Sequence, residues 1–401
     1  MTSFQYEAIK KSGEVVTGTL EADGQGAVAE RLRGMGLMAT EIKEVKPSSS
    51  SFSIFKRKKK VKLGDLSLFS RQLAAMLNAG IPLTRALYTL SRQVENQTLS
   101  VALTEISRNV EGGSSLSESL KGYPHIFSEL YVNMVNAGES GGSLELSLNR
   151  LSNQLQKSKE LQDNIKSAMF YPVVVLGFAV IILFAMLFFL VPIFMGFFPE
   201  GAELPAPTMM IIALSNLARN YWFIIFPLLI LLFFLASSYI KSKKGKEKID
   251  RLTYNMPIFG PLIQKTAVAN FARTFSTMLS TGIPVVQALD ASGKASGNTL
   301  VIEAAITAGE KIQEGSSVAE PLEESGVFPP MVTHMIAVGE ETGDIPEMMD
   351  KVAAFFEEEV ATITKGLTSL IEPLMLVFIG VLVGGMLIAL YLPIFTVITQ
   401  I

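Results

Sequence analysis

The chain has 401 residues, enough for two or three folded units, and its formal net charge is only −3. Its mean hydropathy of +0.38 is high for a soluble protein. The small net charge argues against nucleic acid as a partner, since nucleic-acid-binding proteins normally carry a strong basic excess. The absence of cysteine excludes disulfides, thiolate metal sites and a cysteine nucleophile. With only two histidines, His125 and His334, no catalytic, metal or cofactor site is expected.

Residues 1–45 predict a small α+β domain. Its expected elements are a β-hairpin over residues 4–9 and 15–20, a short helix over 27–33 and a further strand over 39–45. The first 13 residues are polar and of mixed charge, unlike a signal peptide. We therefore expect this domain to stay in the cytoplasm.

A linker is expected over residues 46–62, where a run of serines precedes Lys56-Arg-Lys-Lys-Lys. The basic run fits a solvated linker, and it also fits contact with anionic lipid headgroups. Nucleic-acid contact is a third interpretation, which the small net charge of the chain disfavours.

The pattern of residues 63–170 predicts a cytosolic helical bundle. Asp65 is a candidate N-cap for a first helix whose apolar residues recur on one face. Gly80 fits the left-handed position after that helix, and Pro82 fits the first turn of the next one. Further helices are expected over residues 98–110 and 128–137, and from residue 143 toward the membrane. Few residues favour strands, so the bundle should be small and antiparallel.

This unit recurs in the chain at an offset of 202 residues, or 201 after a one-residue slip. The pairs include Phe69 with Phe271, Arg71 with Arg273, Gly80 with Gly282, Pro82 with Pro284, Gly138-Glu139 with Gly339-Glu340, and Gly142 with Gly343. The repeat continues into the membrane, where Pro172 matches Pro373 and Pro192 matches Pro393. A second cytosolic bundle is therefore expected over residues 241–370.

Three apolar stretches are long enough to cross a bilayer, over residues 171–195, 220–240 and 371–396. Lysines and arginines flank the first two spans on the side of the bundles, whereas the 196–219 loop holds one basic residue, Arg219. We expect the N-terminus and both bundles in the cytoplasm, and the loop and C-terminus outside. The repeat-related spans then run parallel, and the span between them returns the chain to the cytoplasm.

The glycine-rich segments Gly138–Gly142 and Gly339–Gly343 are the most prominent candidate sites. They lack the G-x-x-x-x-G-K-S/T pattern and follow no predicted strand, so a bound nucleotide is not expected. We expect Glu139 and Glu340 to cap the N-terminus of the following helix. The alternative is contact with a partner or with a divalent cation.

Two further patterns lie in the spans. Gly380 and Gly384 form a small-xxx-small pattern, for which helix association and no special role are both open. Prolines bracket the first and third spans and predict kinks there, because a proline leaves one backbone carbonyl without its amide partner. These prolines are Pro172, Pro192, Pro373 and Pro393.

Essentially the whole chain resembles the GspF/PilC family, the polytopic inner-membrane platform proteins of type IV pilus and type II secretion machines. The resemblance rests on Gly80-Ile-Pro-Leu and Gly282-Ile-Pro-Val, on Gly138-Glu-Ser-Gly-Gly and Gly339-Glu-Glu-Thr-Gly, and on Tyr171-Pro and Glu372-Pro at the start of two spans. The outer-loop segment Glu203-Leu-Pro-Ala-Pro-Thr looks like the pilus branch.

The resemblance implies a non-enzymatic platform for type IV pilus biogenesis. Such a platform couples a cytosolic assembly ATPase to pilin insertion or extraction, contacts pilin or pseudopilin subunits and other inner-membrane components, and forms a homo-oligomer. The equivalent platform of a type II secretion system is the alternative. A membrane transporter is a distant alternative, because the spans carry no ionisable residue apart from Glu372 at an edge.

Overall fold

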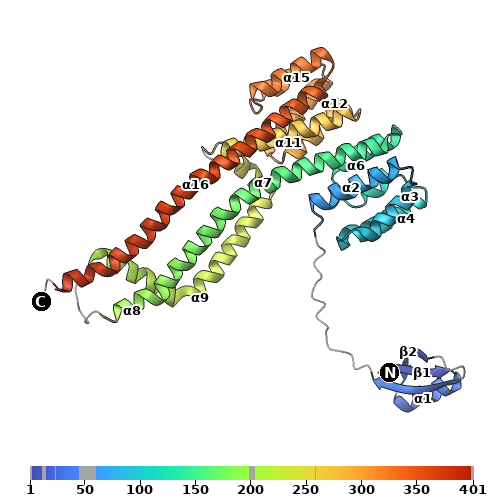
Figure 1. Ribbon diagram of the computed structural model, residues 1–401, viewed down its shortest axis with the longest axis horizontal. Helices are drawn as coiled ribbons and strands as arrows, with labels where there is room; N and C mark the ends of the chain where they lie inside the picture. The colour runs from blue at the N-terminus through green and yellow to red at the C-terminus, as the bar shows by residue number, and fades with distance from the viewer. Residues whose placement is uncertain are drawn as a thin grey trace. The chain divides into compact units, whose positions relative to one another are not determined.

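The computed structural model describes residues 2–10, 15–22, 24–44, 60–197, 204–257 and 259–398. The chain divides into two compact units, residues 1–59 and 60–401. Helices dominate, and within the described residues a single small sheet lies in the first unit (Figure 1). The predicted fold class, a mainly α membrane protein with a small α+β domain at its N-terminus, is confirmed.

The first unit has the elements that its sequence predicts. These are β1 (Thr2–Lys10), β2 (Val15–Ala22), α1 (Gln25–Gly34) and β3 (Leu37–Glu44). The strands pair antiparallel in the order β2-β1-β3. Phe4 from β1 packs with Val28 and Leu32 from α1 to form the small core. The linker expected over residues 46–62 lies outside the described residues up to residue 59.

The first repeat is a helical bundle. Its helices are α2 (Leu63–Asn78), α3 (Leu83–Gln93), α4 (Gln97–Glu111), α5 (Leu116–Lys121), α6 (Glu129–Ser140) and the first part of α7 (Leu144–Ala185). Gly80 ends α2 with a φ of +79°, and the N–H of Ile81 reaches back to the carbonyl of Met76 at 3.0 Å. This Schellman turn is the stop that the glycine predicts.

Two predicted helix starts are off by a few residues. Asp65 was expected as an N-cap, but α2 begins at Leu63 and Asp65 is the third residue of the helix. From there its carboxylate accepts the N–H of Lys62 at 3.1 Å, so it still satisfies an amide at the helix start. Pro82 is the N-cap of α3 rather than part of its first turn. The two N-cap residues, Lys62 and Pro82, have the extended backbone that precedes a helix.

The second repeat has the same order of helices. They are α11 (Gly260–Ser280), α12 (Val285–Ser296), α13 (Thr299–Gln313), α14 (Ala319–Glu324), α15 (Pro330–Thr342) and the first part of α16 (Ile345–Ile398), with α10 (Lys243–Tyr254) placed before them. Gly282 repeats the left-handed turn of Gly80 at the same φ of +79°. One hydrophobic core runs through both bundles, because α2 packs on α7, α11 on α16, and α7 on α16.

In the described part of the chain, three helices are long and apolar enough to cross a membrane: Leu144–Met195, Ala206–Ile240 and Ile345–Pro393. The first combines α7 with a π-helical turn, η1 (Met186–Leu190), and with α8 (Val191–Met195). The α16 helix continues from the second bundle without a break. Each repeat-related span is thus the extension of a helix that is also part of a bundle core.

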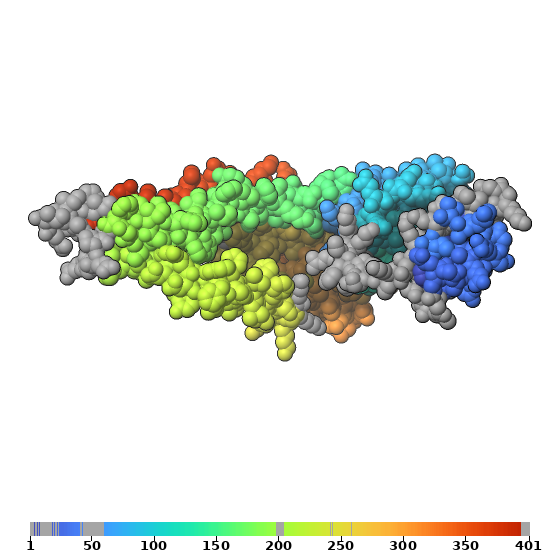
Figure 2. All heavy atoms as spheres, turned by 90° about the horizontal axis from the view of Figure 1, so that it is seen from below, coloured from blue at the N-terminus to red at the C-terminus, as the bar shows by residue number. Residues whose placement is uncertain are grey.

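The helix between them, α9 (Ala206–Lys241), is longer than its sequence predicts. A loop was expected over residues 196–219, but the chain is helical from Ala206 onward. The charge of Arg219 indicates the boundary of the membrane span, but a single arginine does not end a helix. Figures 1 and 2 both show α9, in yellow-green, lying alongside α7.

Candidate functional site

Gly138 and Gly339 lie where two helices approach each other closely in each bundle. A Cβ added to Gly138 would stand 2.5 Å from the hydroxyl oxygen of Ser147, and one added to Gly339 would stand 2.7 Å from the Cα of Ile345. Both glycines are buried and lie in the last turn of a helix, α6 or α15. Their shared role is therefore to let that helix pack closely against the start of α7 or α16.

The two glycine-rich segments are less loop-like than expected. Gly138 and Glu139 belong to α6, and Gly339 and Glu340 belong to α15. Only the last residues form the turn, where Gly142 and Gly343 have φ values of +67° and +79°. A non-glycine residue would be strained in this left-handed conformation. The segments are tight helix-to-helix turns, a geometry that offers no phosphate cradle.

Glu139 and Glu340 bind backbone amides at a helix start, as expected, but the helix is a different one. The Glu139 carboxylate accepts the N–H groups of Leu116 (2.5 Å) and Ser117 (3.0 Å), the first residues of α5. Glu340 accepts the N–H of Val318, just before α14, at 2.9 Å. The prediction of the following helix was wrong, because the glutamates point back to the short helix that precedes them. These bonds tie α6 to α5 and α15 to α14 in both repeats.

Pro192 and Pro393, at equivalent positions of the repeat, each leave a backbone carbonyl without its amide partner. A hydroxyl group of α9 donates a hydrogen bond to each of these carbonyls. Pro393 lies inside α16 and cannot donate to the carbonyl of Ala389, four residues earlier. The hydroxyl of Thr208 in α9 donates to that carbonyl at 2.5 Å. Thr208 is buried, so the bond lies away from the surrounding medium. It supplies the partner that the proline removes.

The same arrangement occurs at Pro192. The N–H of Val191 bonds to the carbonyl of Met186, five residues earlier, so the helix follows π-helical spacing here. In that spacing residue 192 would donate to the carbonyl of Leu187, which the proline cannot do. Ser215 of α9, also buried, donates to it at 2.5 Å. The sequence prediction missed both hydroxyls, although their spacing of seven residues places them on one face of α9.

The other candidate residues in the spans are Pro172, Pro373, Gly380 and Gly384. The α7 helix runs through Pro172 and α16 runs through Pro373 without interruption. A Cβ added to Gly380 or Gly384 would meet nothing within 4 Å. These two glycines therefore do not support a close helix contact within the described part of one chain, and their role in association between chains stays a prediction.

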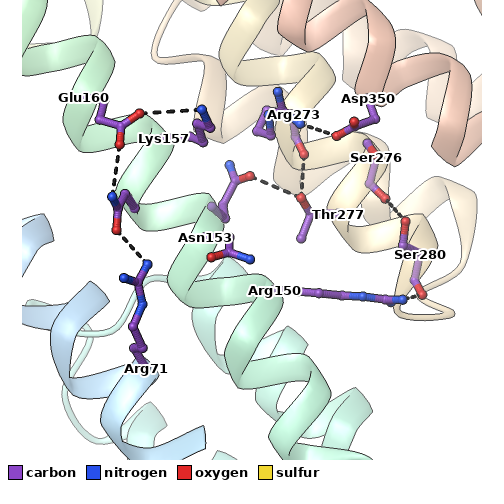
Figure 3. A pocket seen from close by; sticks show the side chains of 12 residues that line it. Arg71, Arg150, Asn153, Lys157, Glu160, Arg273, Ser276, Thr277, Ser280 and Asp350 are labelled. Carbon is purple, nitrogen blue, oxygen red and sulfur yellow. Dashed lines mark hydrogen bonds and ion pairs between the residues drawn. The ribbon is translucent and has the colours of Figure 1, made fainter. Parts of the chain in front are cut away.

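The two repeats meet along α7 and α11, where polar groups line a hollow of about 520 Å³. Gln154 of α7 donates to the hydroxyl of Thr274 (3.0 Å) and accepts from that of Thr277 (3.1 Å). Arg150 reaches across to the carbonyl of Ser280 at the end of α11 (Figure 3). Arg71 of α2 lies on one side of the hollow and Arg273 of α11 on the other.

Arg273 forms ion pairs with two carboxylates of α16. Its guanidinium donates to both oxygens of Glu357 at 2.8 and 3.0 Å and also pairs with Asp350. Burial alone would lower the pKa of Arg273, but hydrogen bonds and charges from Glu357 and Asp350 outweigh it and raise that pKa. Among the described residues, no group of three or more potential ligands could hold a metal ion. The polar groups at this junction hold helices together.

Comparison with known families agrees with the internal repeat. The family described as Type II secretion system (T2SS), protein F matches the chain twice, over residues 69–192 and 271–393. The family described as Type II secretion system protein F, N-terminal domain matches residues 1–43. The two matches begin at the equivalent Phe69 and Phe271 and end at the equivalent Pro192 and Pro393. Their limits are therefore those of the bundle-plus-span unit.

Individual relatives match nearly the whole chain. The type IV pilus assembly protein PilC of Thermus thermophilus is 43% identical over 99% of this chain and 98% of its own length. PilC of Myxococcus xanthus is 39% identical over 98% of this chain and 94% of its own. The type II secretion system protein F of Vibrio cholerae is 32% identical over 88% of each chain.

Proposed function

The chain belongs to the type II secretion system protein F family, and from this premise we propose that it is an inner-membrane platform protein for type IV pilus biogenesis. The choice between a type IV pilus and a type II secretion system rests on one observation. Four relatives named for type IV pilus assembly are 38–43% identical, whereas three relatives named for type II secretion, and one named a type 4 fimbrial assembly protein, are 30–32% identical. The platform would couple a cytosolic assembly ATPase to the insertion or extraction of pilin subunits.

The helices give this coupling a physical basis. The α7 and α16 helices each belong to a bundle core at one end and to a membrane span at the other. A displacement of either bundle is thus carried into the membrane by a continuous helix rather than by a flexible linker. The bundles are the expected contact for the ATPase, and the exposed apolar span surfaces are the expected contact for pilin.

The proposed orientation places the N-terminus and both bundles in the cytoplasm and the C-terminus outside. The lysines that precede the first span and follow the second support it, as does the scarcity of basic residues between these spans. The proposed role is mechanical and needs no catalysis by this chain. The lack of cysteine and the small number of histidines are consistent with it.

Deletion of the gene in its own organism tests the proposal. Surface pili should disappear and return when the wild-type chain is supplied from a plasmid, and the purified chain should retain a hexameric assembly ATPase. Normal piliation in the deletion strain would refute the pilus role. Loss of protein secretion with intact pili would instead support the alternative, the platform of a type II secretion system, which the V. cholerae relative favours.

A further inference from the structure

The two repeats differ in how they satisfy one equivalent arginine. Arg273 in the second repeat is held by two carboxylates of α16, Asp350 and Glu357, and only 14% of its side chain is exposed. Its counterpart Arg71 donates to the amide oxygen of Gln156 at 2.6 Å and to the hydroxyl of Ser152 at 3.3 Å. Both of these acceptors are neutral, so the same guanidinium is neutralised in one repeat and left without a carboxylate in the other.

Arg71 and Arg273 have different acceptors because the two repeats differ at two positions. At the offset of 201, Asp350 corresponds to Asn149 and Glu357 corresponds to Gln156. The α7 helix therefore presents amides at the two positions where α16 presents acids. Among the residues that the structure describes, no carboxylate forms an ion pair with Arg71, whose side chain is exposed.

The surroundings of Arg71 are open and basic. It lines the 520 Å³ hollow together with Arg150 and Lys157, and Asp350, which also lines this hollow, is paired with Arg273. Arg71 also lines an adjoining hollow of about 260 Å³ with Lys159, which pairs with Asp163 at 3.1 Å. The one acid shared by both hollows, Glu160, lies 3.6 Å from Lys157, and both of these side chains are about half exposed. Such a surface pair contributes little and exchanges readily with water or a ligand.

We propose that this groove, lined by Arg71, Arg150 and Lys157, binds an acidic segment of a partner protein. A carboxylate of the segment would take the place beside Arg71 that Glu357 takes beside Arg273. A guanidinium and a carboxylate form two parallel hydrogen bonds, which fixes the segment's direction as well as its charge. The adjoining linker over residues 46–62 is basic, so the chain's own segment next to α2 does not supply the acid.

The proposed groove rests on the proposed function, because it is a surface on which the platform would bind a partner protein. It is tested by binding to the purified chain, so its failure would leave the piliation experiment unaffected. The probe is a fluorescent alanine-based helical peptide with Asp and Glu seven residues apart, the spacing of Asp350 and Glu357 on α16. A peptide with Asn and Gln at the same two positions is the uncharged control.

Three variants of the full chain in detergent make the test specific. Arg71→Gln removes the guanidinium, whereas Gln156→Glu supplies the carboxylate of the second repeat and should occupy Arg71 internally. Arg108→Gln, an exposed arginine of α4 outside the groove, is the matched control. We expect the acidic peptide to bind wild type and Arg108→Gln equally, and to bind the other two variants about tenfold or more weakly.

Gln156→Glu keeps the test decisive, because it adds an ion pair with Arg71 at the cost of the hydrogen bond that Gln156 donates to Glu160 at 3.0 Å. These two effects oppose each other, so the variant should stay folded, and its unfolding temperature measured beside wild type checks this. Loss of binding in this variant cannot then be attributed to misfolding. Equal binding by wild type and Gln156→Glu, or equal binding of the acidic and uncharged peptides, would overturn the proposal. Peptide displacement by inorganic phosphate at equal concentration would show a small-anion site instead. Loss of self-association in Gln156→Glu without any peptide binding would assign the groove to a second copy of the chain.

Discussion

The hydroxyl of Thr208 donates a hydrogen bond to the carbonyl of Ala389, the carbonyl that Pro393 leaves without an amide partner. Ser215, two turns further along α9, does the same for the carbonyl of Leu187, five residues before Pro192. The helix that has no counterpart in the repeat thus binds both repeat-related spans at their equivalent prolines. It returns the chain to the bundle side, and it also joins the two spans.

Replacing these hydroxyls should loosen the spans. We expect Thr208→Val and Ser215→Ala each to cost about 1 kcal/mol, because each leaves a buried carbonyl unsatisfied. The measurement is the unfolding midpoint of the full chain in detergent. Ser238→Ala, on an exposed position of the same helix, is the control and should leave the midpoint unchanged. An equal shift in all three variants would mean that the α9 hydroxyls act only through helix propensity.

Gly339 should be far less tolerant of a side chain than another glycine of the same region. Gly339→Ala places a Cβ 2.7 Å from the backbone of Ile345, so α15 and α16 must move apart, at a cost of about 1–3 kcal/mol. Gly366→Ala in α16 meets nothing within 4 Å and should be neutral or stabilising, because alanine favours the helix. Thermal unfolding of the two variants side by side checks this, and the opposite order would contradict the close approach.

Glu139 should contribute to stability through its two amide bonds to α5. Glu139→Gln keeps the shape of the side chain but removes its charge, and we expect a loss of about 1 kcal/mol. Glu111→Gln, whose exposed side chain makes no hydrogen bond among the described residues, is the control. If the two variants unfold together while only Glu139→Gln loses pili, the glutamate acts on a partner rather than on the fold.

The sequence predicts the local features of this fold well and the long-range ones poorly. The turn at Gly80 and the cap-like role of Asp65 depend on neighbours a few residues away, so their residue types reveal them. Glu139 contacts a residue 23 positions earlier, and Thr208 one that is 181 positions later. The sequence offers no periodic signal for such contacts.

The internal repeat is the exception, because it carries long-range information within one chain. It predicts that Arg71 and Arg273 occupy equivalent places, and the structure then shows how differently they are held. The start of α9 was missed for another reason. The charge of Arg219 indicates a membrane boundary, but helix and membrane boundaries need not coincide.

Tyr131 should make the first bundle sensitive to alkaline pH. Its ring is fully buried, and its hydroxyl lies 2.8 Å from that of Ser70, which itself donates to the carbonyl of Leu66. Burial raises the pKa of Tyr131 well above its usual value of about 10, and the bond to Ser70 only partly opposes this. Above pH 10 the unfolded chain therefore loses the phenolic proton while the folded chain keeps it.

Stability from this group is thus complete below about pH 10 and falls above it, by about 1.4 kcal/mol per pH unit until the folded pKa is reached. Tyr131→Phe should be less stable than wild type at pH 8 by about 1 kcal/mol, because it loses the bond to Ser70. Its stability should nevertheless fall less steeply between pH 10 and 11.5. Circular dichroism of the full chain in detergent measures both slopes, with Tyr88→Phe, a half-exposed ring, as the control. Parallel slopes for wild type and Tyr131→Phe would show that the phenol ionises equally in both states.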